Sequence, residues 1–218
     1  CIPVLMGRGE IFCRAGEPVR AGWELGSFHD RAGTNTLFVV PQLAYMKRDG
    51  RPGAFAKPGG FRAFLEELLA GTLSQYLGGP HNLSDVDSID IVAHSAGYKT
   101  ALAIMERGHL SKGLIKSVVL FDALYGETPR FARYIEANAD FGLRFVSISL
   151  PPGTPYRESK HLWRRLRRIL GVDFRGIAKT LLLFVGHDGK SHHEAVFLGY
   201  PALIGQGDQV AADAQMGE

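Results

Sequence analysis

The stretch of sequence that decides the fold is "IDIVAHSAGYKTALAIMERG", residues 89–108. It opens with an apolar run that predicts a buried strand over residues 88–93. Small residues then surround Ser95, and apolar residues at helical spacing continue to about Arg107, where Gly108 can end a helix. The stretch therefore predicts a strand that passes into a helix through a sharp joint, with a serine at the joint.

The same alternation extends to both sides of this stretch. Further strands are predicted from short apolar runs at residues 2–6, 36–40, 117–121, 143–150 and 180–186. Helices are predicted at residues 61–77, 129–139 and 158–170, with a last one that opens at Ser191. This alternation predicts a single doubly wound α/β domain over residues 1–218, with a mostly parallel sheet and helices on both faces. We expect the polar tail, about residues 205–218, to be frayed or disordered.

The size and composition of the chain narrow the possible classes of function. The chain has 218 residues, which suits one domain, and its formal net charge of +3 is too small to predict a nucleic-acid partner. Its two cysteines, Cys1 and Cys13, form no CxxC pair, so a zinc site is not expected, and whether they pair with each other stays open. No apolar run is long enough to cross a bilayer.

The residues around the serine are Ala93-His94-Ser95-Ala96-Gly97, which differ from the pattern G-x-S-x-G by an alanine at the first position. Small residues are needed there because a sharp strand-to-helix turn brings the two backbones close together. Such a turn lifts the serine hydroxyl above the carboxyl edge of the sheet, beside the backbone amides that begin the helix. The alternative is that Ser95 serves only as the N-cap of the helix.

With the order of elements around it, this joint resembles the nucleophile elbow of the α/β-hydrolase family, and the resemblance extends from Ile2 to about Ile204. It implies a Ser-His-Asp triad, no cofactor, and hydrolysis of a carboxylic ester or a related acyl bond through an acyl-enzyme. Two residues depart from the family pattern, Ala93 at a glycine position and Met6 where histidine often stands. The alternative function is therefore a non-catalytic binding protein on the same fold.

The acid of the triad is predicted from its place after a strand. Asp122 follows the strand at 117–121, and the strand at 143–150 offers no acid before Glu158. Because the acid of this fold follows either of these two strands, Asp122 is the candidate.

The base is predicted among three histidines in "GHDGKSHHEAVF". His192 and His193 open the last helix, where the family places its histidine, whereas His187 comes too early after the strand. A helix N-terminus keeps an imidazole neutral, and so able to accept a proton. The choice between the two stays open, with His192 preferred for its His-x-Glu order. The spacing of the three histidines fits no common zinc pattern, so no metal is expected.

Two backbone amides are implied as oxyanion donors by the resemblance. One is that of Ala96, which follows the nucleophile, and the other is that of Arg8, with Gly7 allowing close approach. The same "GRG" begins a dinucleotide-binding fingerprint, but Phe12 stands where that pattern requires its third glycine.

Two further segments carry weaker signals. The Gly/Pro-rich loop at residues 50–60 is expected to rim the substrate pocket, together with Tyr45, Phe55 and Tyr125. The helix at 158–170 carries four arginines, which form either a solvated surface or a contact for an anionic partner. These arginines are Arg164, Arg165, Arg167 and Arg168.

Overall fold

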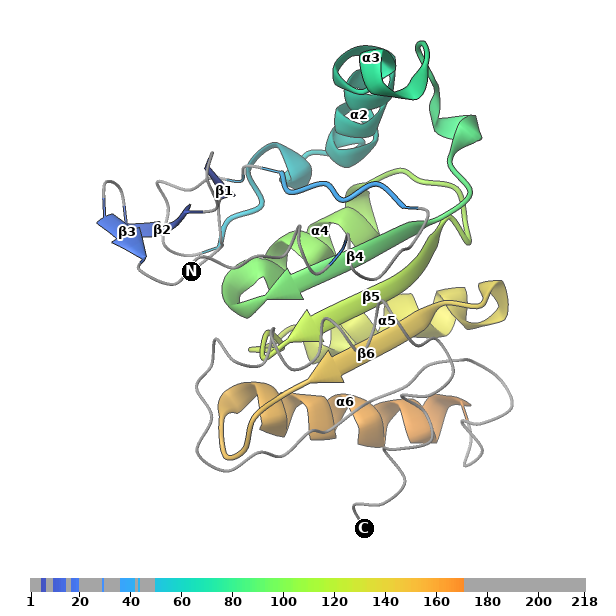
Figure 1. Cartoon of the computed structure of the whole chain (residues 1–218). Helices are drawn as coiled ribbons and strands as arrows, with labels where there is room; N and C mark the ends of the chain where they lie inside the picture. Colours follow the sequence, from blue (N-terminus) through green and yellow to red (C-terminus); the bar gives the residue numbers. More distant parts are fainter. Residues whose placement is uncertain are drawn as a thin grey trace.

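The computed structural model describes residues 5–6, 10–14, 17–19, 29, 36–41, 43 and 50–170. It has a mixed α/β fold, centred on a parallel sheet with the strand order β4-β5-β6. The strands are β4 (Ile89–His94), β5 (Ile115–Phe121) and β6 (Arg144–Ile148). Figure 1 shows them side by side with their arrowheads at the same end, so one edge of the sheet collects the residues that follow each strand.

Helices connect the strands and share one core with them. α4 (Tyr98–Arg107) joins β4 to β5, α5 (Thr128–Asn138) joins β5 to β6, and α6 (Thr154–Leu170) follows β6 (Figure 1). Right-handed crossovers that advance in one direction place successive helices on the same face of a sheet. The buried core accordingly joins this face to the helices, through Ile91, Val118, Leu120 and Phe145 from the strands and Leu102, Phe131, Leu162 and Leu166 from the helices.

The strand register fixes three rows of side chains on the opposite face of the sheet. Since side chains alternate along a strand, the neighbours of Ile91, Val118 and Phe145 point away from the helices. The register of the three strands then aligns a polar row, a valine row and a last row beside the carboxyl edge. These rows are Asp90, Ser117 and Arg144, then Val92, Val119 and Val146, then His94, Phe121 and Ile148.

The helix predicted at 61–77 is interrupted. α2 (Gly60–Glu67) passes into a π-helical turn at Leu68–Thr72, and a short α3 (Ser74–Leu77) follows. The amide of Leu73 donates to the carbonyl of Leu68, five residues back, at 2.9 Å, which is the π-type bond. The α-helical hydrogen bonding is interrupted there because glycine and threonine, the last two residues of this turn, are weak helix formers.

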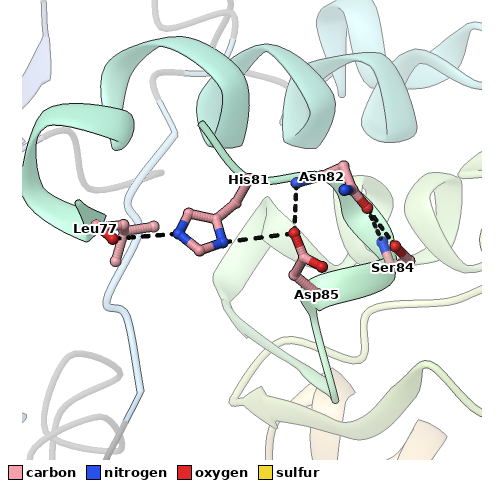
Figure 2. A network of polar contacts seen from close by, with 5 residues as sticks. All are labelled: Leu77, His81, Asn82, Ser84 and Asp85. Atoms are coloured by element: carbon pink, nitrogen blue, oxygen red, sulfur yellow. Dashed lines mark hydrogen bonds and ion pairs between the residues drawn. The ribbon is translucent and has the colours of Figure 1, made fainter. Parts of the chain in front are cut away.

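A polar network fixes the connection from α3 to β4 (Figure 2). Asn82 caps a short 3-10 helix at Leu83–Asp85, its Oδ1 accepting from the amide of Ser84 at 2.9 Å while its own amide donates to Asp85 Oδ2 at 3.0 Å. The His81 ring lies between Asp85 Oδ2, at 3.5 Å, and the carbonyl of Leu77, at 3.2 Å. This reciprocal cap ends the helical region and directs the chain into β4 at its amino end.

Two predicted strands are corrected by the structure. The segment 2–6 was expected in the parallel sheet, but β1 (Leu5–Met6) pairs antiparallel with β2 (Glu10–Arg14), which pairs antiparallel with β3 (Glu17–Val19) in a separate sheet. Connections of three and two residues are too short for the crossover that parallel strands need.

Residues 36–40 form no strand, although their sequence is apolar and β-branched. Leu37 is 54% exposed and Val39 is 40% exposed. The carbonyl of Thr36 contacts His29 Nε2 at 3.0 Å. Residues of high β-propensity form a strand only where packing supports it. The exposure of these side chains shows that they are little packed here.

The remaining predicted elements are confirmed where the structure describes them. The strands at 88–93, 117–121 and 143–150 correspond to β4, β5 and β6 within a few residues, and α4 ends at the expected glycine. α6 begins four residues earlier than predicted, because Pro155 suits a first helical turn. No described helix is both long and apolar enough to cross a membrane. The predicted strand at 180–186, the helix from Ser191 and the tail at 205–218 lie outside the described residues.

Candidate functional site at the carboxyl edge of the sheet

Ser95 lies at the joint between β4 and α4 in a strained backbone conformation. It opens the 3-10 turn Ser95–Gly97, its φ is +54°, and its exposed fraction is 8%. A positive φ costs an L-residue other than glycine roughly 1–2 kcal/mol, and serine lacks the tolerance of asparagine or aspartate. An ordinary N-cap has β-region dihedrals, so this conformation does not fit the simple capping alternative. Strain of this kind is held where the surrounding structure fixes a side chain in place.

Small residues hold this joint together as the sequence predicted. A Cβ on Gly97 would lie 3.4 Å from the Cβ of Ala93, so the two positions face each other across the turn with room for only small side chains. Gly50, with φ +68°, approaches from the other side, and a Cβ there would lie 2.5 Å from the carbonyl oxygen of Ala96. The backbone of the segment before η1 (Gly53–Ala56) therefore rests directly against the turn that holds Ser95.

The amide of Ala96 belongs to the first turn of the helical region after Ser95. Backbone N–H groups at the start of a helix have no partner within the helix, and the helix dipole favours negative charge there. This amide is the predicted oxyanion donor, and the structure places it in the same turn as the serine.

Asp122 lies at the end of the neighbouring strand, beside Ser95. His94 is in register with Phe121, so Ser95 and Asp122 are the next residues along two adjacent strands, and strands lie about 4.8 Å apart. Asp122 is 6% exposed and has a φ of +42°. Its amide donates to the carbonyl of Ile148 at 2.6 Å, and its Oδ1 accepts from the amide of Leu150 at 3.2 Å. The acid is thus anchored to the end of β6, with its carboxylate at the shared edge.

Tyr125 lies with Ser95 and Asp122 at this edge, and its contact with Ser95 was not predicted. Its hydroxyl hydrogen-bonds with the side chain of Ser95 and lies within the electrostatic reach of Asp122. Burial of the hydroxyl and the negative charge of Asp122 raise the pKa of Tyr125, while the bond with Ser95 opposes the shift. The ring lies 6.2 Å from that of Tyr98, between centroids. The sequence indicated Tyr125 only as an apolar rim residue; its place in the loop just after the acid is the signal that could have suggested more.

Phe55 does not line a pocket, contrary to the expectation for the loop at 50–60. It is 6% exposed and packs edge-on against Phe61, with ring centroids 5.2 Å apart, in the hydrophobic core. Three aromatic residues share this cluster, since Phe64 lies 5.3 Å from Phe55. The loop contributes its backbone to the site, through Gly50, and its aromatic side chain to the core.

The remaining predicted site residues lie outside the described residues. They are the bases His192 and His193, the oxyanion residues Gly7 and Arg8, and the rim residue Tyr45. Cys1 also lies outside, so the pairing of the cysteines stays open. Within the described ranges, no three His, Cys, Asp or Glu side chains gather in a way that could hold a metal ion.

Three of the five described histidines have places in the fold other than that of the base. His81 is paired with Asp85 before β4, and six strand residues at about 3.3 Å each separate that end from Ser95. His161 lies on α6, where its Nδ1 is 3.8 Å from Glu158. His94 is buried in the row that contains Phe121.

Comparison of the chain with protein-family models, curated proteins and solved structures found no significant match. The residues at the carboxyl edge of β4 and β5 are therefore the basis on which a function can be assigned.

Proposed function

We propose that this protein is a serine hydrolase of the α/β-hydrolase type that cleaves a carboxylic ester or a related acyl bond. The observation that carries the proposal is Ser95, a buried serine at φ +54° on a strand-to-helix turn. Asp122 at the end of the next strand and the amide of Ala96 in the same turn add to it. A strained serine beside a buried carboxylate and free helix amides is the arrangement that nucleophilic acyl transfer requires.

The proposed reaction proceeds through an acyl-enzyme. The Oγ of Ser95 attacks the substrate carbonyl while His192 or His193 takes its proton, and the same imidazolium then protonates the leaving group. Asp122 orients the imidazole and stabilises its charged form. The amides of Ala96 and Arg8 stabilise the tetrahedral oxyanion, and a water molecule activated by the histidine releases the acid.

Tyr125 holds the nucleophile in this scheme. The hydrogen bond between the two hydroxyls holds the side chain of Ser95 in one rotamer at rest. Burial and the charge of Asp122 raise the pKa of Tyr125, so its hydroxyl stays protonated in the neutral range and does not serve as the general base. We therefore assign Tyr125 to positioning the Oγ of Ser95.

The proposal includes a complete doubly wound sheet, with helices on both faces. In this proposal, the predicted strand at 180–186 and the helix from Ser191 bring the histidine to the carboxyl edge. In the β4–β6 unit, the row of Val92, Val119 and Val146 on the face away from α4 is apolar, as a sheet covered on both faces requires.

The test is intact mass after treatment with a fluorophosphonate probe, which reacts only with an activated serine. We expect a single adduct on the wild type, none on Ser95→Ala, and none or a much slower one when His192 or His193, whichever is the base, is replaced by alanine. Ser84→Ala is the matched control and should be labelled like the wild type. A folded wild type that takes no adduct contradicts the proposal and favours the binding-protein alternative.

A further inference from the structure

α6 carries an excess of positive charge that the rest of the chain does not share. Its 17 residues hold six Lys and Arg side chains and one Glu, a net charge of +5. The whole chain carries +3, so the remaining residues are net negative by two. The basic residues are Arg157, Lys160, Arg164, Arg165, Arg167 and Arg168.

Most of the charge of α6 faces solvent, because the apolar side of the helix packs in the core; of its basic residues, only Arg165 is partly buried. Leu162 and Leu166 are fully buried against the residues of the sheet and α5. Ser159, also fully buried, bonds to Ser147 of β6 at 2.8 Å between hydroxyl oxygens. Arg164 and Arg167 are exposed on the remaining arc of the helix.

The lysine and arginine side chains of α6 form no ion pair with an acid among residues 50–170, although His161 of this helix lies 3.8 Å from Glu158. The one acid of the helix, Glu158, is bound by the hydroxyl of Thr128. By contrast, Arg130 on α5 is paired with both Glu106 and Glu127. The molecule thus neutralises a cation on the neighbouring helix and leaves the lysines and arginines of α6 without an acidic partner in the described part.

Two of these cations instead lie against aromatic rings of the same helix. The ammonium of Lys160 is 4.4 Å from the centroid of Tyr156, and the guanidinium of Arg167 is 4.6 Å from the centroid of Trp163. Both pairs have the i, i+4 spacing that brings side chains together on a helix. The result is a surface on which basic groups and half-buried amphipathic rings alternate along the helix axis.

We propose that the outward surface of α6 docks the protein on an anionic lipid membrane. Basic side chains near such a surface each strengthen binding, and Trp and Tyr are suited to the boundary between headgroups and acyl chains. A planar bilayer contacts only one face of a protein, and the outward surface of α6 is an exposed face with positive charge.

A single-stranded nucleic acid is the less favourable partner. Its bases require open aromatic faces on which to stack, whereas a cation of the helix itself already occupies a face of each ring. The net negative charge of the remaining residues also opposes a polyanion that wraps around more than one face of the molecule.

Sedimentation of the intact chain with lipid vesicles tests this docking. Wild type is mixed with vesicles of phosphatidylcholine alone or with about 30% phosphatidylserine, at about 50 mM and about 500 mM salt. The variant carries Arg164→Glu, Arg167→Glu and Arg168→Glu. The control carries Lys57→Glu, Arg62→Glu and Lys112→Glu, three exposed cations outside α6, so both variants change the net charge equally.

We expect wild type to bind only the anionic vesicles, and less at high salt. The α6 variant should lose about a hundredfold or more of its partition coefficient, since each of three basic residues contributes roughly a fivefold factor. The control variant should lose much less. Failure of wild type to sediment, equal loss in both variants, or tighter binding to a single-stranded oligonucleotide than to the vesicles would overturn the proposal. Thermal melting of each variant shows whether it is folded. If the α6 variant is not folded, the same three arginines are changed to glutamine instead.

Discussion

The two ends of β4 hold similar side chains in different physical states. At the amino end, Ser84, His81 and Asp85 belong to one network (Figure 2). At the carboxyl end, Ser95 and Asp122 lie at the ends of adjacent strands. A search for serine, histidine and aspartate would select the amino end, where all three are present within five residues.

The difference between the two ends lies in backbone strain and burial. The amino-end network is a capping box with relaxed dihedrals, and its members are exposed or half-buried. At the carboxyl end, Ser95 and Asp122 are both buried and both have positive φ, although neither is glycine. At Ser95 this conformation costs on the order of 1–3 kcal/mol, which the surrounding structure must offset. Strain on buried polar residues therefore distinguishes the candidate site from a structural cap of the same composition.

The largest expected effect separates the two aspartates. Asp122→Asn should lower kcat/KM for a short-chain ester by roughly 10⁴-fold, because an amide leaves the catalytic histidine in the wrong tautomer. Asp85→Asn should leave turnover unchanged and lower the free energy of unfolding by less than about 1 kcal/mol, because the amide oxygen of asparagine can still accept from the amide of Asn82. Steady-state kinetics with thermal melting measures both. Equal loss of activity in the two variants would remove the distinction between the ends.

A second comparison concerns glycines with positive φ. Gly50→Ala should lower kcat/KM by roughly a hundredfold, since its Cβ would lie 2.5 Å from the carbonyl of Ala96 and displace the oxyanion amide of that turn. Gly78→Ala has the same kind of strain, with φ +79°, but its Cβ meets nothing within 4 Å. It should cost about 1 kcal/mol of stability and no activity. Unchanged turnover in folded Gly50→Ala would show that the turn tolerates the displacement.

The parallel unit could be predicted from sequence because its signals are local. The strand-to-helix joint at Ser95, the apolar runs of β5 and β6 and the proline that opens α5 each carry their own pattern. The N-terminal hairpins could not be predicted in the same way. The segment 2–6 looks like a buried strand, and only its pairing with Glu10–Arg14, which has an apolar run of just three residues, shows that it is antiparallel. The strand predicted at residues 36–40 was wrong for a similar reason, since β-propensity alone does not decide whether a segment forms a strand.

The candidate site was predictable to the extent that topology alone determines it. Parallel strands end at one edge, so Ser95 and Asp122 had to be neighbours once their strands were adjacent. The contact of Tyr125 with Ser95 depends on how the loop turns after Asp122, at φ +42°, and residue types do not specify that direction.

Tyr125→Phe sharpens the comparison at the carboxyl end. Removing the hydroxyl deletes one hydrogen bond to Ser95, worth roughly 1–2 kcal/mol, so kcat/KM should fall by about tenfold while KM changes little. Tyr134→Phe is the matched control, because Tyr134 also has a raised pKa from burial but lies on α5. A fall in stability without a fall in kcat would reduce Tyr125 to a structural residue. Slower fluorophosphonate labelling of the variant would support positioning independently of any substrate.

The smallest expected effect lies in the amino half of β4, at Asp90. Burial raises the pKa of Asp90 above 3.8, and Arg144 and the hydroxyl of Ser117 offset this only in part. The folded state therefore holds the proton more tightly than the unfolded state. The stability associated with this group is greatest below about pH 3.8 and is lost as the pH rises through the higher folded value.

Asp90→Asn should accordingly raise the free energy of unfolding near pH 7 by a few tenths of a kcal/mol and change it little near pH 3, since solvent screens this exposed side chain. Urea unfolding at the two pH values measures the difference, with Asp87→Asn as the control in the connection before the strand. Destabilisation near pH 7 would mean that the pairing with Arg144 outweighs the burial. In that case the polar row of Asp90, Ser117 and Arg144 would stabilise the fold. The polar residues in the amino half of β4 would then be stabilising, whereas Ser95 at its carboxyl end is strained.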